Sequence, residues 1–208
     1  MPTTPAVSLP PPENVAKLAH WVAKLSADLK TAQWSKPFGT ACQITGMAAD
    51  DTGEVVLIGQ GDPGCDLGAG PFQEAAAYVA RYTATGAVRF AKLLHANTLP
   101  YMKSTAVDAQ GNVLVAGTLR SIVTGDWGNL SGGPSDEAFV IKFDPKGAHL
   151  WSGALGAFEQ PDGGNAVAAW KTGEVLLGGF VSGYVSLGGP TIDPKGKFDA
   201  FLAKYAAY

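Results

Sequence analysis

A short apolar pattern with one basic residue recurs four times along the chain. The copies are Trp21–Leu25 (WVAKL), Tyr78–Tyr82 (YVARY), Phe139–Phe143 (FVIKF) and Phe201–Tyr205 (FLAKY). Their basic residues lie 57, 61 and 62 positions apart. Self-similarity at a nearly fixed spacing indicates a repeat architecture, and this spacing is long enough for one four-stranded unit.

Two further strands are expected before each of the last three copies. Small apolar stretches are followed by a glycine-containing turn and then by a continuous apolar run; the runs are 55–59, 113–117 and 175–179. Glycine supplies the positive φ of a tight hairpin, and a continuous apolar run is typical of a strand buried on both faces. A fourth strand, after the basic one, carries Trp34, Phe90 or Trp151.

This pattern predicts an all-β fold, a β-propeller built of four-stranded antiparallel blades. Each sheet has two apolar faces that must be buried against the next sheet, and small residues suit a first strand near a crowded axis. A two-sheet sandwich is the alternative, but it does not require the period. We divide the chain into a Pro-rich lead-in (1–19), a partial blade (20–39), two blades (40–95 and 96–156) and a second partial blade (157–208).

The expected strands make about three blades, whereas closed propellers usually have four to eight. We therefore expect a piece of a longer propeller, or a ring completed by another chain. Two copies that contribute three blades each would make six, which is a hypothesis.

Residues 13–32 are ambiguous. Val15, Leu18, Val22, Leu25 and Leu29 fall at helical spacing without Gly or Pro between them, which favours an amphipathic helix. The repeat instead predicts a degenerate strand pair over 20–39, and we adopt that interpretation.

Three segments resemble a known family, the bacterial β-propeller repeats of the SBBP type. The segments are 199–205 (DAFLAKY), 106–117 (AVDAQGNVLVAG) and 150–152 (LWS). The resemblance extends over residues 20–208 and concerns structural residues, so it implies a fold and says little about activity. It implies an extracellular or cell-surface location, although no signal peptide stands at the start of this sequence.

Composition excludes several classes of function. The formal net charge is -3 and the basic residues are scattered, so we expect no nucleic-acid partner. No apolar run approaches the length of a membrane span. No cofactor is expected, and no metal site, because the Asp-x-x-Gly turns at Asp50, Asp108 and Asp144 are more typical of backbone capping than of calcium binding.

Two sequence motifs are candidates for a chemical role. Cys42 and Cys65 flank the first hairpin, and we place them opposite each other at its open end, as a disulfide or as two buried thiols. The match to GxGxxG at residues 59–64 lacks the following helix that a dinucleotide site needs, because Pro63 and the later glycines forbid one.

The long connections are the expected functional surface. They join the second to the third strand (60–76, 118–136, 180–198) and the fourth to the next first strand (95–103, 157–164), and in a meander they share one face. Binding residues concentrate on such loops. The candidate ligand-binding residues are His95, Asn97, Tyr101, Arg120, Glu159, Asp162 and Tyr184.

We therefore predict a non-enzymatic scaffold for binding or assembly, acting through this loop face or through open edge strands. The expected partner is a protein or a second copy completing the propeller, with a glycan as the other candidate. The alternative function is an enzyme with its site at the mouth of the central channel.

Overall fold

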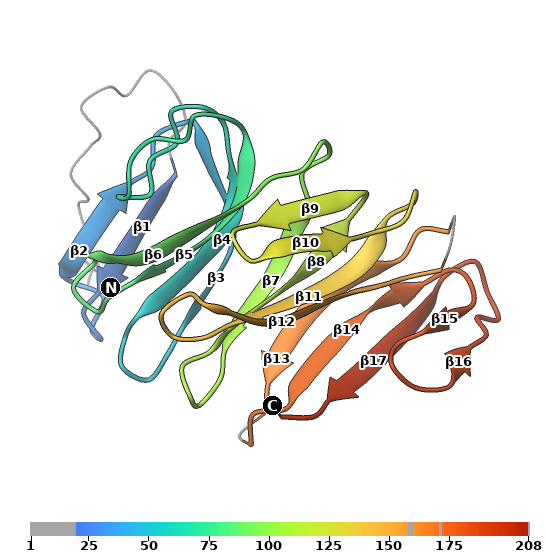
Figure 1. Ribbon diagram of the computed structural model, residues 1–208. Coiled ribbons are helices and arrows are strands. Elements are labelled where there is room, and N and C mark those ends of the chain that lie inside the picture. Colours follow the sequence, from blue (N-terminus) through green and yellow to red (C-terminus); the bar gives the residue numbers. More distant parts are fainter. Residues whose placement is uncertain (1–19, 158–159, 171, 208) are drawn as a thin grey trace, which may run out of the picture.

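The computed structural model describes residues 20–157, 160–170 and 172–207. The described residues form β-strands joined by turns and loops, without a helix, and every strand pair is antiparallel (Figure 1). The predicted all-β class is confirmed. The Pro-rich lead-in lies outside the described residues.

Residues 20–39 form a β-hairpin of β1 (Trp21–Leu25) and β2 (Ala32–Pro37). The strand-pair interpretation is confirmed for these residues, and the helical alternative is wrong for them. Leu29 adopts a φ of 59° in the connecting loop, a conformation that a helix does not allow. Val22 and Trp34 pack on the following sheet, so tertiary contacts override the local helical pattern.

Three larger sheets follow, each a meander in chain order. Sheet 1 contains β3 (Cys42–Ala49), β4 (Val55–Gly61), β5 (Ala76–Tyr82) and β6 (Val88–Leu94). Sheet 2 contains β7 (Tyr101–Val107), β8 (Val113–Leu119), β11 (Glu137–Phe143) and β12 (His149–Leu155). Sheet 3 contains β13 (Gly163–Ala169), β14 (Val175–Val181) and β17 (Asp199–Tyr205).

Two of the long connections expected from the sequence contain short hairpins. These are β9 (Ile122–Gly125) with β10 (Gly128–Ser131), and β15 (Val185–Ser186) with β16 (Thr191–Ile192). Val123, Leu130 and Val185 are buried. The hairpins form because each gives one or two apolar side chains to the core between the sheets.

The first strand of each sheet carries a bulge at the same repeat position. The ladder shifts between Ile44 and Gly46, Met102 and Ser104, and Gly164 and Ala166. At Gly59, Gly117 and Gly179 of the second strands, a Cβ atom would collide with a backbone carbonyl oxygen of the bulged strand. The recurring glycine of the second strand is therefore a steric requirement of the fold.

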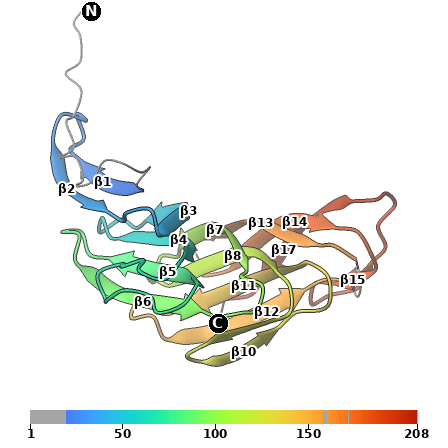
Figure 2. The same cartoon turned by 90° about the horizontal axis from the view of Figure 1, so that it is seen from above.

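Successive sheets pack face to face, and each has two distinct faces. We call the side turned towards the next sheet the forward face: Val56, Ile58, Ala77 and Val79 in sheet 1, and Leu114, Ala116, Ala138 and Val140 in sheet 2. The opposite, backward face carries Tyr78, Ala80 and Tyr82 in sheet 1, and Phe139, Ile141 and Phe143 in sheet 2. Seen from above, β3, β7 and β13 lie along one side of the molecule while β6 and β12 lie on the other (Figure 2).

The recurring basic residue of the third strand contacts the short turns, and in sheet 1 it also reaches the next sheet. The buried Arg81 pairs with Asp50 at 2.6 Å and with Glu54 at 2.8 Å in its own sheet, and it donates to the Gly111 carbonyl of sheet 2. Lys142 is buried and pairs with Asp108 at 3.0 Å. The repeated cation is thus a structural contact at the short turns.

Candidate functional site

Two adjoining pockets lie among the long connections next to the end of β6. One, of about 430 Å³, is lined mainly by polar side chains; its lining is Glu74, Ala75, His95, Ala96, Asn97, Ser121, Ile122 and Thr124. The other, of about 590 Å³, is lined mainly by apolar groups from residues 67–74 and from β6. Glu74 and His95 line both pockets. Together the two pockets form one groove, which we call the β6 groove.

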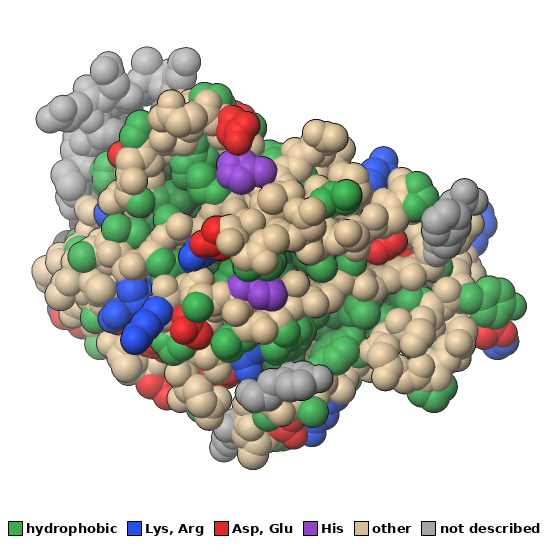
Figure 3. All heavy atoms as spheres, viewed as in Figure 1, with side chains coloured by type: hydrophobic (Ala, Val, Ile, Leu, Met, Phe, Trp, Pro, Cys, Tyr) green, Lys and Arg blue, Asp and Glu red, His purple; other side chains and the backbone are tan. Residues whose placement is uncertain are grey.

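Alternate residues along β6 form the floor of the apolar pocket. Ala91, Leu93 and His95 line it, and residues two apart in a strand point to the same face of a sheet. Leu67 and Phe72 from the preceding connection complete the wall. In the space-filling view, hydrophobic side chains gather over this part of sheet 1, and a histidine beside an acidic side chain borders them (Figure 3).

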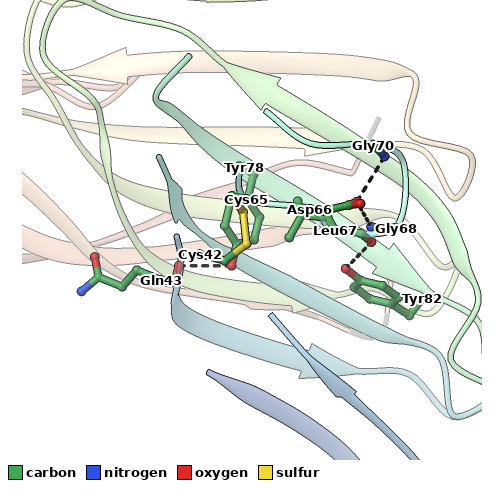
Figure 4. Close-up of a disulfide and its surroundings, with 9 residues drawn as sticks. All are labelled: Cys42, Gln43, Cys65, Asp66, Leu67, Gly68, Gly70, Tyr78 and Tyr82. Carbon is green, nitrogen blue, oxygen red and sulfur yellow. Dashed lines mark hydrogen bonds between the residues drawn. A yellow bond between two sulfur atoms is a disulfide. The ribbon is translucent and has the colours of Figure 1, made fainter. Parts of the chain in front are cut away.

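A disulfide holds the connection that makes this wall. Cys42 and Cys65 are bonded, with their Cα atoms 5.0 Å apart (Figure 4). The predicted disulfide is confirmed, and the alternative of two buried thiols is wrong. Cys65 does not face Cys42 as its strand partner: Cys42 pairs with Gly61 in the ladder, and Cys65 folds back over that glycine from the loop. A side chain at position 61 would collide with the Cys65 side chain and Phe72.

Hydrogen bonds fix the same loop further. Tyr82 donates its hydroxyl to the Leu67 carbonyl at 2.9 Å, and the Asp66 carboxylate accepts from the amides of Gly68 and Gly70 (Figure 4). Burial raises the pKa of Tyr82 above its ordinary value, so the phenol stays protonated and remains a donor. The apolar pocket is therefore built on a fixed loop.

His95 and Ser121 give the polar pocket two unusual atoms. His95 Nδ1 lies 3.1 Å from the exposed Glu74 carboxylate but not in hydrogen-bond geometry. Ser121, at the base of the β9–β10 hairpin, has a φ of 69°. Within the described part of the chain, both His95 Nδ1 and Ser121 Oγ are buried atoms without a hydrogen-bond partner. Buried polar atoms are normally paired, so the packing around the polar pocket leaves these two atoms unsatisfied.

Asp162 has a different role from the one the sequence predicted. We expected a ligand-binding loop residue, but its side chain is fully buried and accepts hydrogen bonds from the amides of Ala157 and Ser182. Burial raises its pKa, and also that of nearby Glu137, which accepts from the Gly133 amide. Through these hydrogen bonds, both carboxyl groups fix the position of connecting segments of sheets 2 and 3.

The remaining candidates do not come together. Tyr101 lies in β7 rather than in a loop, because the first strand of sheet 2 begins earlier than the sequence predicted. Arg120 pairs with Asp136 at 3.0 Å on the surface, and Tyr184 is exposed beyond β14. Glu159 lies outside the described residues. Of the six candidates that lie among the described residues, His95 and Asn97 line this polar pocket together.

One further histidine makes a notable contact outside the groove. His149 stacks on Trp127 with ring centroids 5.0 Å apart, and its Nε2 lies 3.0 Å from Ser152 Oγ. Burial lowers the pKa of His149. Trp127 also packs edge-on against Phe143, so this cluster seats the β9–β10 hairpin on sheet 2.

Metal ligands do not gather in the part of the chain that the structure describes: no group of three or more His, Cys, Asp or Glu side chains there could hold an ion. Asp50, Asp108 and Asp144 each accept hydrogen bonds from backbone amides two and four residues later. These carboxylates cap their own turns.

A second feature is the forward face of sheet 3. Leu176, Gly178, Ala200 and Leu202 occupy the positions that form the forward faces of sheets 1 and 2. Val79 is 0% exposed and Val140 is 1% exposed, but Leu202 is 75% exposed. Sheet 3 thus presents to solvent the same apolar face that the other sheets bury.

Comparisons with known proteins assign no family. No protein-family model matches the chain. The regulatory protein FlaEY of Caulobacter vibrioides is 28% identical over 130 residues, which is 61% of this chain and only 13% of that protein. The crystal structure of a protein of unknown function from Bacteroides caccae matches 88% of this chain and 57% of its own chain, with 15% identity and a TM-score of 0.43. Among the described residues, no helix is long and apolar enough to cross a membrane.

Proposed function

We propose that this chain is a sector of a β-propeller and that it serves as a non-enzymatic assembly module. The observation that carries the proposal is the exposed forward face of sheet 3. Between sheets 1 and 2, and between sheets 2 and 3, this face is covered by the backward face of the following sheet. The repeat therefore supports a backward face of the same kind as the partner surface for Leu202.

The chain also presents a matching surface at its other end. Val22 and Trp34 of the hairpin pack on sheet 1, so alternation turns Trp21 and Ala23 to the opposite side. These residues occupy the repeat positions of Tyr78 and Ala80 on the backward face of sheet 1, and they are only partly buried. Each copy thus has one forward face, on sheet 3, and one backward face, on the β1–β2 hairpin, that can contact a partner.

We commit to a second copy of this chain as the partner. The forward face of sheet 3 in one copy would pack on the hairpin of the next, repeating the contact made between neighbouring sheets. Such a head-to-tail contact is heterologous, and it closes into a ring or extends into a filament according to its rotation. Burying a leucine side chain contributes about 1.5–3 kcal/mol, which favours association against the loss of rotational and translational freedom.

The extracellular location and the resemblance to SBBP-type propeller repeats belong to the same proposal. The Cys42–Cys65 disulfide supports an oxidising compartment. A catalytic role is the alternative, and Glu137 and Asp162 are the groups that would support it, because the pKa values of both are raised. Their hydrogen bonds to backbone amides favour structural roles instead.

Sedimentation velocity at increasing concentration tests the proposal. We expect the wild-type chain to associate and Leu202→Lys to remain monomeric, because the lysine places a charge in the apolar contact. Leu150→Lys is the matched control, since Leu150 is an exposed leucine on β12 of sheet 2, and it should associate like the wild type. A monomeric wild type at all concentrations would overturn the proposal.

A further inference from the structure

The β6 groove has the properties of a binding site for an extended peptide. Sheet 1 ends at β6, and in the described structure no further strand pairs along Val88–Leu94 on its outer side. An unpaired strand edge presents alternating N–H and C=O groups that can accept another strand.

The structure already contains one short example of such pairing. His95, directly after β6, exchanges two backbone hydrogen bonds with Thr124 of β9, at 2.9 and 2.8 Å. This bridge closes one end of the edge. A strand lying along the rest of β6 would run about 4.8 Å from it, next to the pocket that Ala91 and Leu93 line.

The two pockets select the side chains of the peptide. The apolar pocket is lined by Leu67, Phe72 and Leu93 among others and has room for one large apolar side chain. It suits a sugar poorly, because hydroxyl groups buried against such walls would lack partners. Phe72 is itself buried, so it offers no open aromatic face for a sugar ring to stack on.

The charge of the residues that line the pockets indicates which second side chain the peptide carries. Among the described residues that line the two pockets, the ionisable ones are His95 and Glu74, and the Glu74 side chain is 73% exposed. A carboxylate at the junction of the pockets attracts a cation. In a strand, residues two apart point to the same face.

We propose that the outer edge of β6 and the β6 groove bind an extended peptide segment that carries a large apolar side chain and, two residues away, a basic one. The apolar side chain enters the pocket of Leu67, Phe72 and Leu93, and the basic side chain meets Glu74. The peptide pairs with β6 as an added strand. This site is separate from the forward face of sheet 3 and does not depend on assembly.

The test is titration of the isotope-labelled full-length chain with an acetylated and amidated pentapeptide, TKTLT, followed by NMR chemical shifts. We expect shifts at β6, at residues 67–74 and at the base of the β9–β10 hairpin. The peptide TKTST should bind about tenfold or more weakly, because it lacks the apolar side chain. TETLT should bind about two- to fivefold more weakly, because its charge is reversed near a partly exposed carboxylate.

Reversing the charge at position 74 distinguishes attraction of the peptide to Glu74 from its general attraction to the charged protein. Glu74→Lys should weaken TKTLT and strengthen TETLT by similar factors. Asp51→Lys makes the same charge change at an exposed position in the turn after β3 and should alter neither. The measurements are repeated on Leu202→Lys, so that failure of peptide binding and failure of assembly are told apart.

Three results would overturn the inference. One is the absence of shifts with millimolar TKTLT. Another is equal binding of TKTLT, TKTST and TETLT. The third is binding of oligosaccharides at these residues while the peptides stay silent.

Discussion

Tyr78 lies directly opposite Gly59 in the β4–β5 ladder, and its ring covers the place where a side chain of Gly59 would stand. Its hydroxyl donates to the Gln43 carbonyl at 3.1 Å, so the tyrosine reaches across the glycine to the bulged strand β3. Phe139 opposite Gly117 and Phe201 opposite Gly179 repeat the arrangement without the hydroxyl. One aromatic–glycine pair per sheet therefore accompanies each bulge.

This pairing predicts which glycines are indispensable. Gly117→Ala should lower the free energy of unfolding by about 1–3 kcal/mol, because the added methyl group collides with the Tyr101 carbonyl and the Phe139 ring. Gly153→Ala in β12 is the control, since nothing lies within 4 Å of its Cβ position, and it should change stability by less than about 0.5 kcal/mol. Urea denaturation measures both; equal losses would contradict the steric account.

Acid should weaken the ion pairs that Asp50 and Glu54 make with Arg81 at the first short turn of sheet 1. Burial alone would raise the pKa of Asp50, but hydrogen bonds from Thr52 and the Glu54 amide, together with the charge of Arg81, lower it below 3.8. For Glu54 the hydrogen bond from Arg89 is the largest cause of the lowered pKa. A carboxyl group whose pKa is lowered by folding stabilises above its ordinary pKa, and this contribution is lost as the pH falls through the folded value.

Asp50→Asn should therefore be less stable than the wild type at pH 7, by about 1–3 kcal/mol, and the difference should shrink towards pH 3. Urea midpoints measured across this range provide the test. Parallel curves for the two proteins would show that Asp50 does not contribute through its charge.

Asp162 should behave as a structural residue. Asn at position 162 places an amide group opposite one of the two backbone donors, so Asp162→Asn should cost about 1–3 kcal/mol at pH 7. The raised pKa of Asp162 means that its contribution is largest at low pH and falls as the pH rises through the folded value. The variant should lack this part of the pH dependence. Arg120→Ala, which removes an exposed ion pair, should cost less than about 1 kcal/mol. If Arg120→Ala lowered the stability more than Asp162→Asn, Asp162 would again be a candidate functional residue.

The disulfide should stabilise the loop behind the β6 groove. A double variant, Cys42→Ser with Cys65→Ser, should lose about 2–4 kcal/mol of unfolding free energy. A reducing agent should lower the melting temperature of the wild type and leave that of the double variant unchanged. If the reducing agent has no effect on the wild type, the cysteines are not bonded in the folded protein.

Much of the fold could be predicted because it depends on residues that recur. The basic residue of the third strand pairs with a carboxylate near the short turn of its own sheet, as in Arg81 with Asp50, Lys142 with Asp108 and Lys204 with Glu174. The glycine of the second strand faces an aromatic residue in each sheet, as Gly59 faces Tyr78. The inserted hairpins could not be predicted, since β9 and β10 span only four residues each and form through Val123 and Leu130 meeting a core built from distant strands.

The candidate site was predicted only in part. His95 and Asn97 were found because long connections were expected to share one face. Glu74 and Ser121 were missed, since nothing in their local sequence marks them and their loops meet through contacts between distant segments, such as the His95–Thr124 bridge. Asp162 was misjudged because an aspartate in a polar loop gives no signal of burial.

Mixing two complementary variants tests the assembly account most directly. Leu202→Lys blocks the forward face of sheet 3, and Trp21→Lys blocks the opposite surface on the β1–β2 hairpin. In sedimentation velocity each variant alone should be monomeric, and an equimolar mixture should contain heterodimers, because one intact face of each kind remains. A mixture that stays monomeric while the wild type associates, or a Trp21→Lys variant that associates by itself, would contradict head-to-tail assembly through these two surfaces.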